Sequence, residues 1–348
     1  MTTSLVTGGS GYFGSLLVRR LLESGHRVRI LDLNGPDDDL AGVDFVAGDI
    51  RDPSLVRAAV DGIDVVFHNV AQVPLAKDSG LLESVNVEGT RVLLDACIDA
   101  GVGKLVHTSS SAVFGVPSSN PVLATTTPRP LEAYGLAKLR AEEACHHAVL
   151  ERGLDVSIVR PRTILGHGRL GIFGILFDWI ADGADPFVLG KGDNRYQFVH
   201  AEDLADACRL AGDTPGPAVL NVGTDRFGTM REALENLCLH AGTGSRVRSL
   251  PTRTTSTAMR AAAALGLAPF APYHWIMYSK SMWFDTEHVT RRLGWTPRWS
   301  NDEMFAQSYE WFLANRDATD SSSASHHRRT AKQGALSVVK RATRLLPG

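Results

Sequence analysis

A glycine-rich turn near the start of the chain constrains the fold more than any other feature of the sequence. Thr7-Gly-Gly-Ser-Gly-Tyr-Phe-Gly14 follows a β-rich run and precedes a helical pattern. Glycines there permit a tight bend, close approach of the backbone to a pyrophosphate, and close packing of helix on strand. The start of the helix adds N–H groups and partial positive charge. The turn predicts a dinucleotide-binding unit with these residues at the phosphates: Gly8, Gly11, Tyr12, Phe13 and Gly14.

The remaining pattern of the first 160 residues extends this unit into a sheet. Short apolar runs alternate with helical patterns, which predicts βαβ units and a parallel sheet buried on both faces. We therefore expect an α/β fold, a Rossmann-type doubly wound parallel sheet with a smaller C-terminal substrate-binding region. The expected strands are 4–7, 27–33, 43–47, 64–68, 104–108 and 155–160, and the expected helices are 12–24, 53–60, 81–100 and 132–152.

Composition divides the chain into four parts. Residues 1–160 are the expected nucleotide-binding domain, which also carries the catalytic candidates. In residues 161–317 the alternation loosens and glycine and proline are frequent, so we expect a substrate-binding region interleaved with the sheet. Residues 318–334 are rich in Ser, Thr, His and Arg and predict a flexible linker. Residues 335–348 are a basic amphipathic tail.

Charge and cysteine content exclude several classes of function. Lys and Arg total 36 against 38 Asp and Glu, a net charge of −2, whereas nucleic-acid binders usually carry a basic excess. The four cysteines lack C-x-x-C spacing and the histidines do not cluster, so we expect no disulfides and no metal site. No apolar run reaches the roughly 18 residues of a membrane span, and no secretory signal is present. The expectation is a cytoplasmic protein that binds a small molecule.

Acidic residues after the second and third strands indicate which dinucleotide is bound. Asp32 lies 18 residues after Gly14, where a carboxylate binds the adenosine ribose hydroxyls and repels a 2′-phosphate. The next two residues are not basic, so NAD is favoured over NADP. Asp49 and Ile50 follow the third strand and are expected near the adenine.

A tyrosine, a lysine and a serine form the candidate catalytic set. Tyr134 and Lys138 are four residues apart at the start of a helix, so they share one face. An ammonium beside a phenol, whose ordinary pKa is about 10, moves that phenol toward general-base range. Ser110 follows the fifth strand, where its hydroxyl can hold the reacting oxygen.

Together these motifs resemble the extended short-chain dehydrogenase/reductases, the group of nucleotide-sugar epimerases and dehydratases and 3β-hydroxysteroid dehydrogenases. The resemblance covers about residues 3–315. Besides the glycine turn, its landmarks are His68-Asn-Val-Ala71, Asn86-Val-Glu-Gly-Thr90, Arg160-Pro161, Phe198-Val-His200-x-x-Asp203 and Leu293-Gly-Trp-x-Pro297.

The resemblance implies a role for each matched residue. Tyr134 is the acid/base, Lys138 holds the nicotinamide ribose and tunes Tyr134, and Ser110 orients the substrate, with Ser109 and Ser111 as its rivals. Val70, Ala71 and Pro161 belong to the nicotinamide side, and Asn86 supports the backbone there. A homodimer is also implied, through the helices at 81–100 and 132–152.

The type of reaction is less constrained. Dehydratases of this group carry Asp-Glu after the hydroxyl residue and decarboxylases keep a Glu, whereas this chain has Ser111 and Ala112. A nucleotide-sugar 4-epimerase with bound NAD is therefore the first hypothesis. Residues 259–283 are apolar and resemble the 3β-hydroxysteroid branch, so a lipophilic-alcohol dehydrogenase is the alternative. A non-catalytic dinucleotide-binding protein is the third.

Basic residues are the remaining candidates for ligand contact. Arg162, Arg169, Lys191 and Arg195 could reach a substrate pyrophosphate, with Ser110 and Ser111 at the sugar. The tail contains no acid, and its cations lie on one helical face. It fits a helix on a membrane surface, a helix docked on the body or a partner, or a mobile segment.

Overall fold

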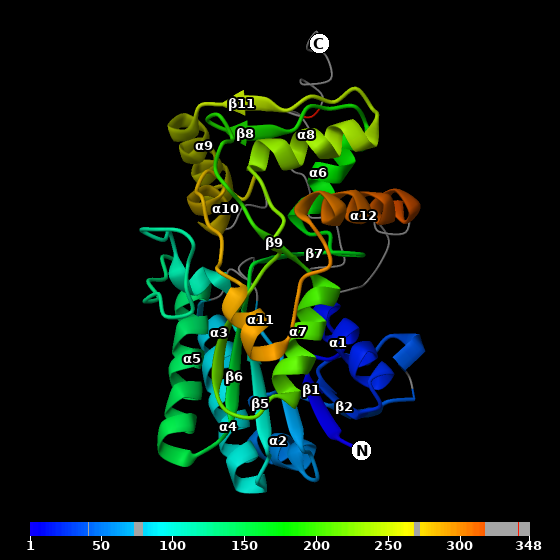
Figure 1. The fold of residues 1–348 in the computed structure, drawn as a ribbon, viewed down its shortest axis with the longest axis vertical. Coiled ribbons are helices and arrows are strands. Elements are labelled where there is room, and N and C mark those ends of the chain that lie inside the picture. Colours follow the sequence, from blue (N-terminus) through cyan, green and yellow to red (C-terminus); the bar gives the residue numbers. More distant parts are fainter. Residues whose placement is uncertain (41, 73–78, 268–271, 317–339, 341–348) are drawn as a thin grey trace.

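A seven-stranded parallel sheet forms the larger part of the protein and confirms the predicted fold class (Figure 1). The structure is a computed structural model that describes residues 1–40, 42–72, 79–267, 272–316 and 340. The strand order is β10-β6-β5-β4-β1-β2-β3. The strands are β1 (Thr3–Thr7), β2 (Arg27–Asp32), β3 (Asp44–Ala47), β4 (Val65–His68), β5 (Lys104–Thr108), β6 (Val156–Pro161) and β10 (Ala218–Val222).

Helices cover both faces of the sheet, as the near-continuous apolar strands require. Side chains alternate along a strand, so Val6 packs on one face and Leu5 on the other. The first face is covered by α1 (Tyr12–Glu23), α7 (Ala201–Asp213) and α11 (Glu287–Leu293). The second face is covered by α2 (Pro53–Val60), α4 (Gly89–Ala100) and α5 (Ala133–Arg152).

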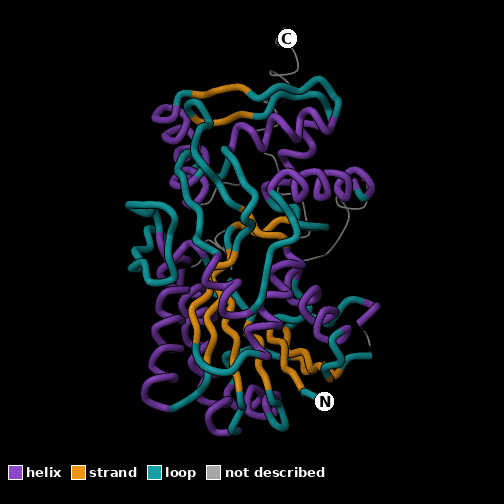
Figure 2. The backbone as a smooth tube through the Cα atoms, viewed as in Figure 1, coloured by secondary structure: helices purple, strands orange, loops and turns teal. Residues whose placement is uncertain are grey.

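A smaller layer lies beyond the carboxyl ends of the strands (Figure 2). Its core combines aliphatic side chains with aromatic ones, among them Phe177, Phe198, Phe305 and Phe312. Two strand pairs belong to it, β7 (Thr163–Leu165) with β9 (Phe198–His200) and β8 (Phe187–Leu189) with β11 (Arg248–Leu250). Its helices are α6 (Ile172–Ala181), α8 (Met230–Ala241), α9 (Thr252–Ala264), α10 (Pro272–Met277) and α12 (Asn301–Ala314).

One predicted element differs from the structure. The single helix expected at 81–100 is instead α3 (Ser79–Glu83), a π-helical segment η2 (Ser84–Glu88) and α4. Within η2, the Asn86 side chain turns to the backbone of Gln72, accepting from its N–H at 2.7 Å and donating to its carbonyl at 3.1 Å. A π segment inside a helix often marks a functional site, and here it aims an amide at the loop after β4.

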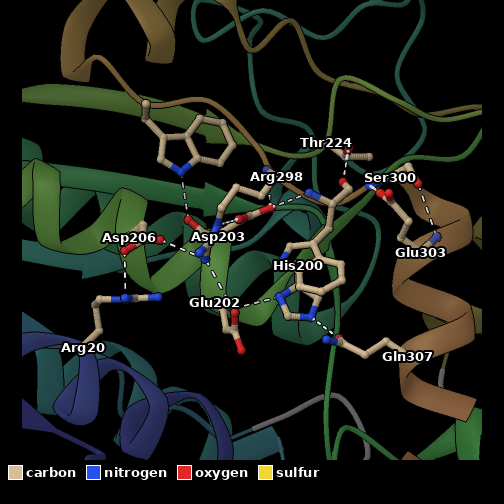
Figure 3. Close-up of polar contacts among 12 residues, drawn as sticks. Arg20, His200, Glu202, Asp203, Asp206, Thr224, Arg298, Ser300, Glu303 and Gln307 are labelled. Carbon is tan, nitrogen blue, oxygen red and sulfur yellow. Dashed lines mark hydrogen bonds and ion pairs between the residues drawn. The ribbon is translucent and has the colours of Figure 1, made fainter. Parts of the chain in front are cut away.

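A polar junction joins the chain after α11 to the start of α7 (Figure 3). Asp203 is buried and accepts hydrogen bonds from the backbone of Arg298 and Trp299 at 2.9 and 3.2 Å. The indole N–H of Trp295 donates to the Asp203 carbonyl at 2.9 Å. The two C-terminal landmarks of the sequence thus meet, and they fasten the small layer to the sheet.

Two of the expected segments lie largely outside the described residues. These are the linker 318–334 and the tail 335–348, of which Lys340 alone is described. Lys340 pairs with Asp178 and Asp182 of α6. Among the described residues, no helix is long and apolar enough to span a bilayer.

The glycine turn gives the first testable prediction. A methyl group at Gly14 would collide with the carbonyl oxygen of Gly8, so Gly14→Ala must open the turn. Overpacking of this kind typically costs about 1–3 kcal/mol. We expect a lower melting temperature and weaker NAD binding, measured by calorimetry. Gly35→Ala, where a Cβ would meet no atom within 4 Å, is the control and should leave both unchanged.

Candidate active site

The glycine turn forms a cradle of close backbone contacts at the end of β1. Gly8 has a φ of +71°, and a Cβ on it would lie 2.9 Å from the Val70 nitrogen. The Gly11 N–H donates to the Gly8 carbonyl at 3.1 Å, and α1 begins at the next residue without a side-chain cap. A cradle formed largely by glycine backbone at a helix N-terminus fits the pyrophosphate of a dinucleotide.

Asp32 lies at the end of β2, beside this cradle. Its carboxylate accepts from the N–H groups of Ser10 and Asn34, each at 3.1 Å. Burial raises the pKa of Asp32, and these backbone hydrogen bonds oppose the shift. Asp49 is engaged by Arg51, which lowers the pKa of Asp49, and Ile50 is packed into the core. Asp32 thus lies next to the glycine turn, at the place where the sequence predicts an acid for the ribose.

Tyr134 and Lys138 lie at the start of α5, and Ser110 follows β5. The buried Lys138 donates from Nζ to the Thr108 carbonyl at 2.8 Å, which joins the two elements. A Cβ on Gly135 would lie 2.5 Å from the Ala112 carbonyl, so α5 starts directly against the turn after Ser110. The structure therefore brings the three predicted catalytic residues to one place.

Each of the three neighbouring serines has a different partner. The Ser109 hydroxyl is buried and donates to Glu142 at 2.5 Å. The Ser111 hydroxyl accepts from Arg162 at 3.0 Å. Among the described residues, the Ser110 oxygen accepts the Ala112 N–H, at 3.1 Å, and its proton has no acceptor there. This division favours Ser110 over its two rivals for contact with substrate.

A buried polar cluster lies beneath Lys138. Burial lowers the pKa of Lys138 to about 8. Burial, assisted by the Lys138 charge, lowers the pKa of His68 to about 3 and that of His107 well below its usual range. His68 bonds the hydroxyls of Thr7 and Thr90 at 2.7 and 2.9 Å, whereas neither ring nitrogen of the buried His107 has a partner in the described structure.

Two of the predicted substrate residues reach the site. The Arg169 guanidinium lies 5.5 Å from the centre of the Tyr12 ring. Burial lowers the pKa of Arg169, opposed by the hydroxyls of Tyr12 and Tyr134, so this cation is close enough to both tyrosines to interact with them electrostatically. Arg162 is fully buried and contacts Ser111.

The other predicted residues are either exposed away from the candidate site or lie at the ends of strands β4 and β6. Lys191 is exposed in the turn after β8, at the end of the small layer away from the sheet (Figure 1). Arg195 is exposed, with its guanidinium within 5 Å of the ring centres of Phe227 and Trp283. Pro161 is buried at the end of β6, and the loop with Val70 and Ala71 follows β4.

Sequence reasoning missed Glu142. It is 1% exposed, accepts from Ser109, and pairs with Arg160 through bonds of 2.9 and 2.5 Å. Helical spacing could have pointed to Glu142, because it lies four residues after Lys138 and eight after Tyr134 and therefore shares their face of α5. It also missed Glu132, whose carboxylate caps α5 by accepting from the N–H groups of Tyr134 and Gly135.

Comparison with known proteins agrees with this geometry. The sequence model of the NAD dependent epimerase/dehydratase family matches residues 4–223. The chain belongs to this family. It is therefore an NAD-dependent enzyme, and the residues of the cradle and Asp32 fit that cofactor.

Individual known proteins match most of the chain. It is 50% identical over 346 residues to a protein of Sinorhizobium fredii called uncharacterized protein y4nG, covering 99% of this chain and 87% of that one. It is 32% identical over 248 residues to a UDP-glucose 4-epimerase of Mycolicibacterium smegmatis, covering 66% and 79%. The solved Thermus thermophilus UDP-glucose 4-epimerase with NAD superposes with a TM-score of 0.73 at 25% identity, covering 90% and 99%.

The position of Asp32 yields a prediction on cofactor preference. Asp32→Asn keeps an acceptor for the Ser10 N–H but removes the charge that repels a 2′-phosphate. Since a hydrogen bond to a charged group is worth roughly 1.5–3 kcal/mol, we expect the preference for NAD over NADP to fall about ten-fold or more in titrations of both cofactors. An unchanged ratio would contradict the ribose role. Asp44→Asn, which removes an exposed acid paired with Arg29, is the control.

The buried histidines predict a pH dependence of stability. Their folded pKa values lie below the unfolded value of 6.5. As the pH falls below 6.5, the unfolded state binds protons that the folded state excludes, so the free energy of unfolding drops by about 1.4 kcal/mol per pH unit for each histidine. His107→Leu should reduce this slope by one such step, measured by urea unfolding between about pH 7.5 and pH 5.5. The exposed His146→Leu should keep the wild-type slope.

Proposed function

We propose that the protein is a nucleotide-sugar 4-epimerase that oxidises a secondary alcohol to a ketone and reduces it again from the other face. The observation that carries this proposal is the meeting of Ser110, Tyr134 and Lys138 beside the dinucleotide cradle. Its similarity to UDP-glucose 4-epimerases supports the substrate class.

Tyr134 is the acid/base in this proposal. Its phenolate would take the proton of the substrate hydroxyl and later return it. NAD held by the glycine cradle and Asp32 would supply the hydride-transfer chemistry at the carbon that bears this hydroxyl. The buried Lys138 ammonium and the Arg169 guanidinium supply positive charge that favours the phenolate. Ser110, whose oxygen already accepts the Ala112 N–H, donates its own proton to the reacting oxygen.

The residues after Ser110 favour epimerisation over elimination. An elimination needs a further acid and base at the reacting sugar, and the two positions that resemble that pair in dehydratases are Ser111 and Ala112. Ser111 is already bonded to Arg162. Neither side chain exchanges protons near neutral pH, so the ketone is reduced again rather than dehydrated.

A second candidate function is oxidation of a lipophilic alcohol, with release of NADH. Apolar surface at the start of the 259–283 segment favours it: Leu265 and Leu267, which follow α9, are 72% and 49% exposed. Within α9 itself no side chain is buried. The two candidates differ in stoichiometry, because a dehydrogenase consumes one NAD per product and an epimerase consumes none.

The proposal extends to assembly and location. Homodimer formation through α4 and α5 is supported by exposed leucines on α5, Leu136 and Leu150, and a pocket between α3 and α5 lies on the same surface. A reducing, cytoplasmic compartment fits four buried cysteines without disulfides.

Replacing Tyr134 tests the chemistry. Tyr134→Phe removes the proton-transfer group, which is worth about a hundred- to ten-thousand-fold in rate, and should leave NAD binding intact. The measurement is conversion of UDP-glucose to its 4-epimer by NAD-loaded protein without added NAD. Tyr309→Phe, in the small-layer core, should keep wild-type turnover. Undiminished activity of Tyr134→Phe in cells would instead favour a non-catalytic dinucleotide-binding protein.

A further inference from the structure

Arg162 is a fully buried cation at the edge of the candidate active site. It follows β6 and is 1% exposed. Its guanidinium carbon lies 4.8 Å from the ring centre of Tyr196 and 5.6 Å from that of Phe284. Aromatic faces stabilise such a cation only in part, so its polar contacts decide what else it requires.

The hydrogen bonds of Arg162 use only one of its three guanidinium nitrogens. Nη1 donates to the Ser111 hydroxyl at 3.0 Å and to the Met282 sulfur at 3.2 Å. Nε and Nη2 are buried and have no partner among the described residues. These two nitrogens form one edge of the planar group, the fork that binds a carboxylate through two parallel hydrogen bonds.

No carboxylate of the described structure pairs with Arg162. The contrast is Arg160, two residues earlier, whose charge is met by Glu142 through two hydrogen bonds. A buried charge with no counter-ion is strongly unfavourable, and proteins pair such charges. The absent partner of Arg162 is therefore best sought in a ligand.

The position of Arg162 fixes where on a substrate that partner lies. Its Nη1 contacts Ser111, so the guanidinium lies next to Ser110, the residue proposed to hold the reacting oxygen. In a nucleotide sugar the pyrophosphate is attached at the anomeric carbon, across the ring from C4. An anionic group next to the reacting carbon, rather than the pyrophosphate, thus matches the site.

We propose that Arg162 binds a carboxylate on the carbon next to the reacting carbinol, so that the substrate is a hydroxy acid. This inference rests on the proposed function for the location of the reacting carbon. Two sources carry this chemistry: a nucleoside-diphosphate hexuronate, and a polycyclic alcohol with a carboxylate beside its hydroxyl. Ser111 supplies a further hydroxyl to the same group.

Binding of matched ligand pairs to the NAD-loaded protein tests the inference. The pairs are UDP-glucuronate with UDP-glucose, and a 4-carboxy-3β-hydroxysteroid with its 4-unsubstituted parent, measured by titration calorimetry. The wild-type protein should bind the acid of one pair about ten- to hundred-fold more tightly than its neutral partner. The pair that shows this preference tells whether the substrate is a nucleotide sugar or a polycyclic alcohol. Arg162→Met should abolish the preference by weakening the acid alone. No acid preference in either pair would overturn the inference.

Two further outcomes separate the alternatives. Equal weakening of UDP-glucose and UDP-glucuronate by Arg162→Met would assign the arginine to the pyrophosphate and overturn the inference. An acid preference in wild type without interconversion of 4-epimers would refute the proposed function and leave Arg162 as the carboxylate site.

Matched variants keep the test interpretable. Because Arg162 lacks an ionic partner, Arg162→Met should fold with little loss of melting temperature, and Arg162→Gln serves if it does not. Arg231→Met removes a cation of α8 that contacts the Lys191 carbonyl and should retain the acid preference. Loss of that preference in Arg231→Met as well would attribute it to overall charge and contradict a specific site.

Discussion

The hydrogen bond from Lys138 to the Thr108 carbonyl is the contact on which the candidate site depends. It fixes the first turn of α5 against the end of β5, so the phenol of Tyr134 and the hydroxyl of Ser110 are positioned by one junction between rigid elements. The ammonium is stabilised there by the carbonyl and by the nearby Glu142. Its charge in turn contributes to keeping His68 and His107 neutral below it, which couples the redox site to the stability of the sheet.

Sequence patterns within single segments predicted the strands of the large sheet and the glycine turn. The short apolar runs and glycine turns gave the strands of the large sheet to within about one residue at each end, because a strand buried on both faces must be apolar throughout. The cradle and Asp32 were predictable for a similar reason. The turn leaves no room for a Cβ at Gly8, Gly9 or Gly14, and Asp32 follows at the usual distance. This combination is typical of a dinucleotide site.

The features that sequence could not supply depend on contacts between distant segments. The π-helical turn at Ser84–Glu88 arises because Asn86 bonds Gln72 across a loop. The resemblance selected Ser110 among three neighbouring serines, but the partners of the other two, Glu142 for Ser109 and Arg162 for Ser111, come from distant segments and could not be predicted. Arginine is mostly a surface residue, so the burial of Arg162 at 1% exposure could not be predicted from its residue type.

The distribution of buried charge connects the reaction to its substrate. Glu142 is the carboxylate that faces both Lys138 and Arg160, and Arg162 has only rings, a sulfur and a hydroxyl around it in the described structure. In the proposed reaction, Ser111 and Ala112 leave no acid for elimination at the two positions after Ser110. A hydroxyl rather than a carboxylate at position 111 also leaves Arg162 without a counter-ion among the described residues. The proposed epimerisation without elimination and the proposed recognition of an anionic alcohol therefore both depend on the residue at position 111.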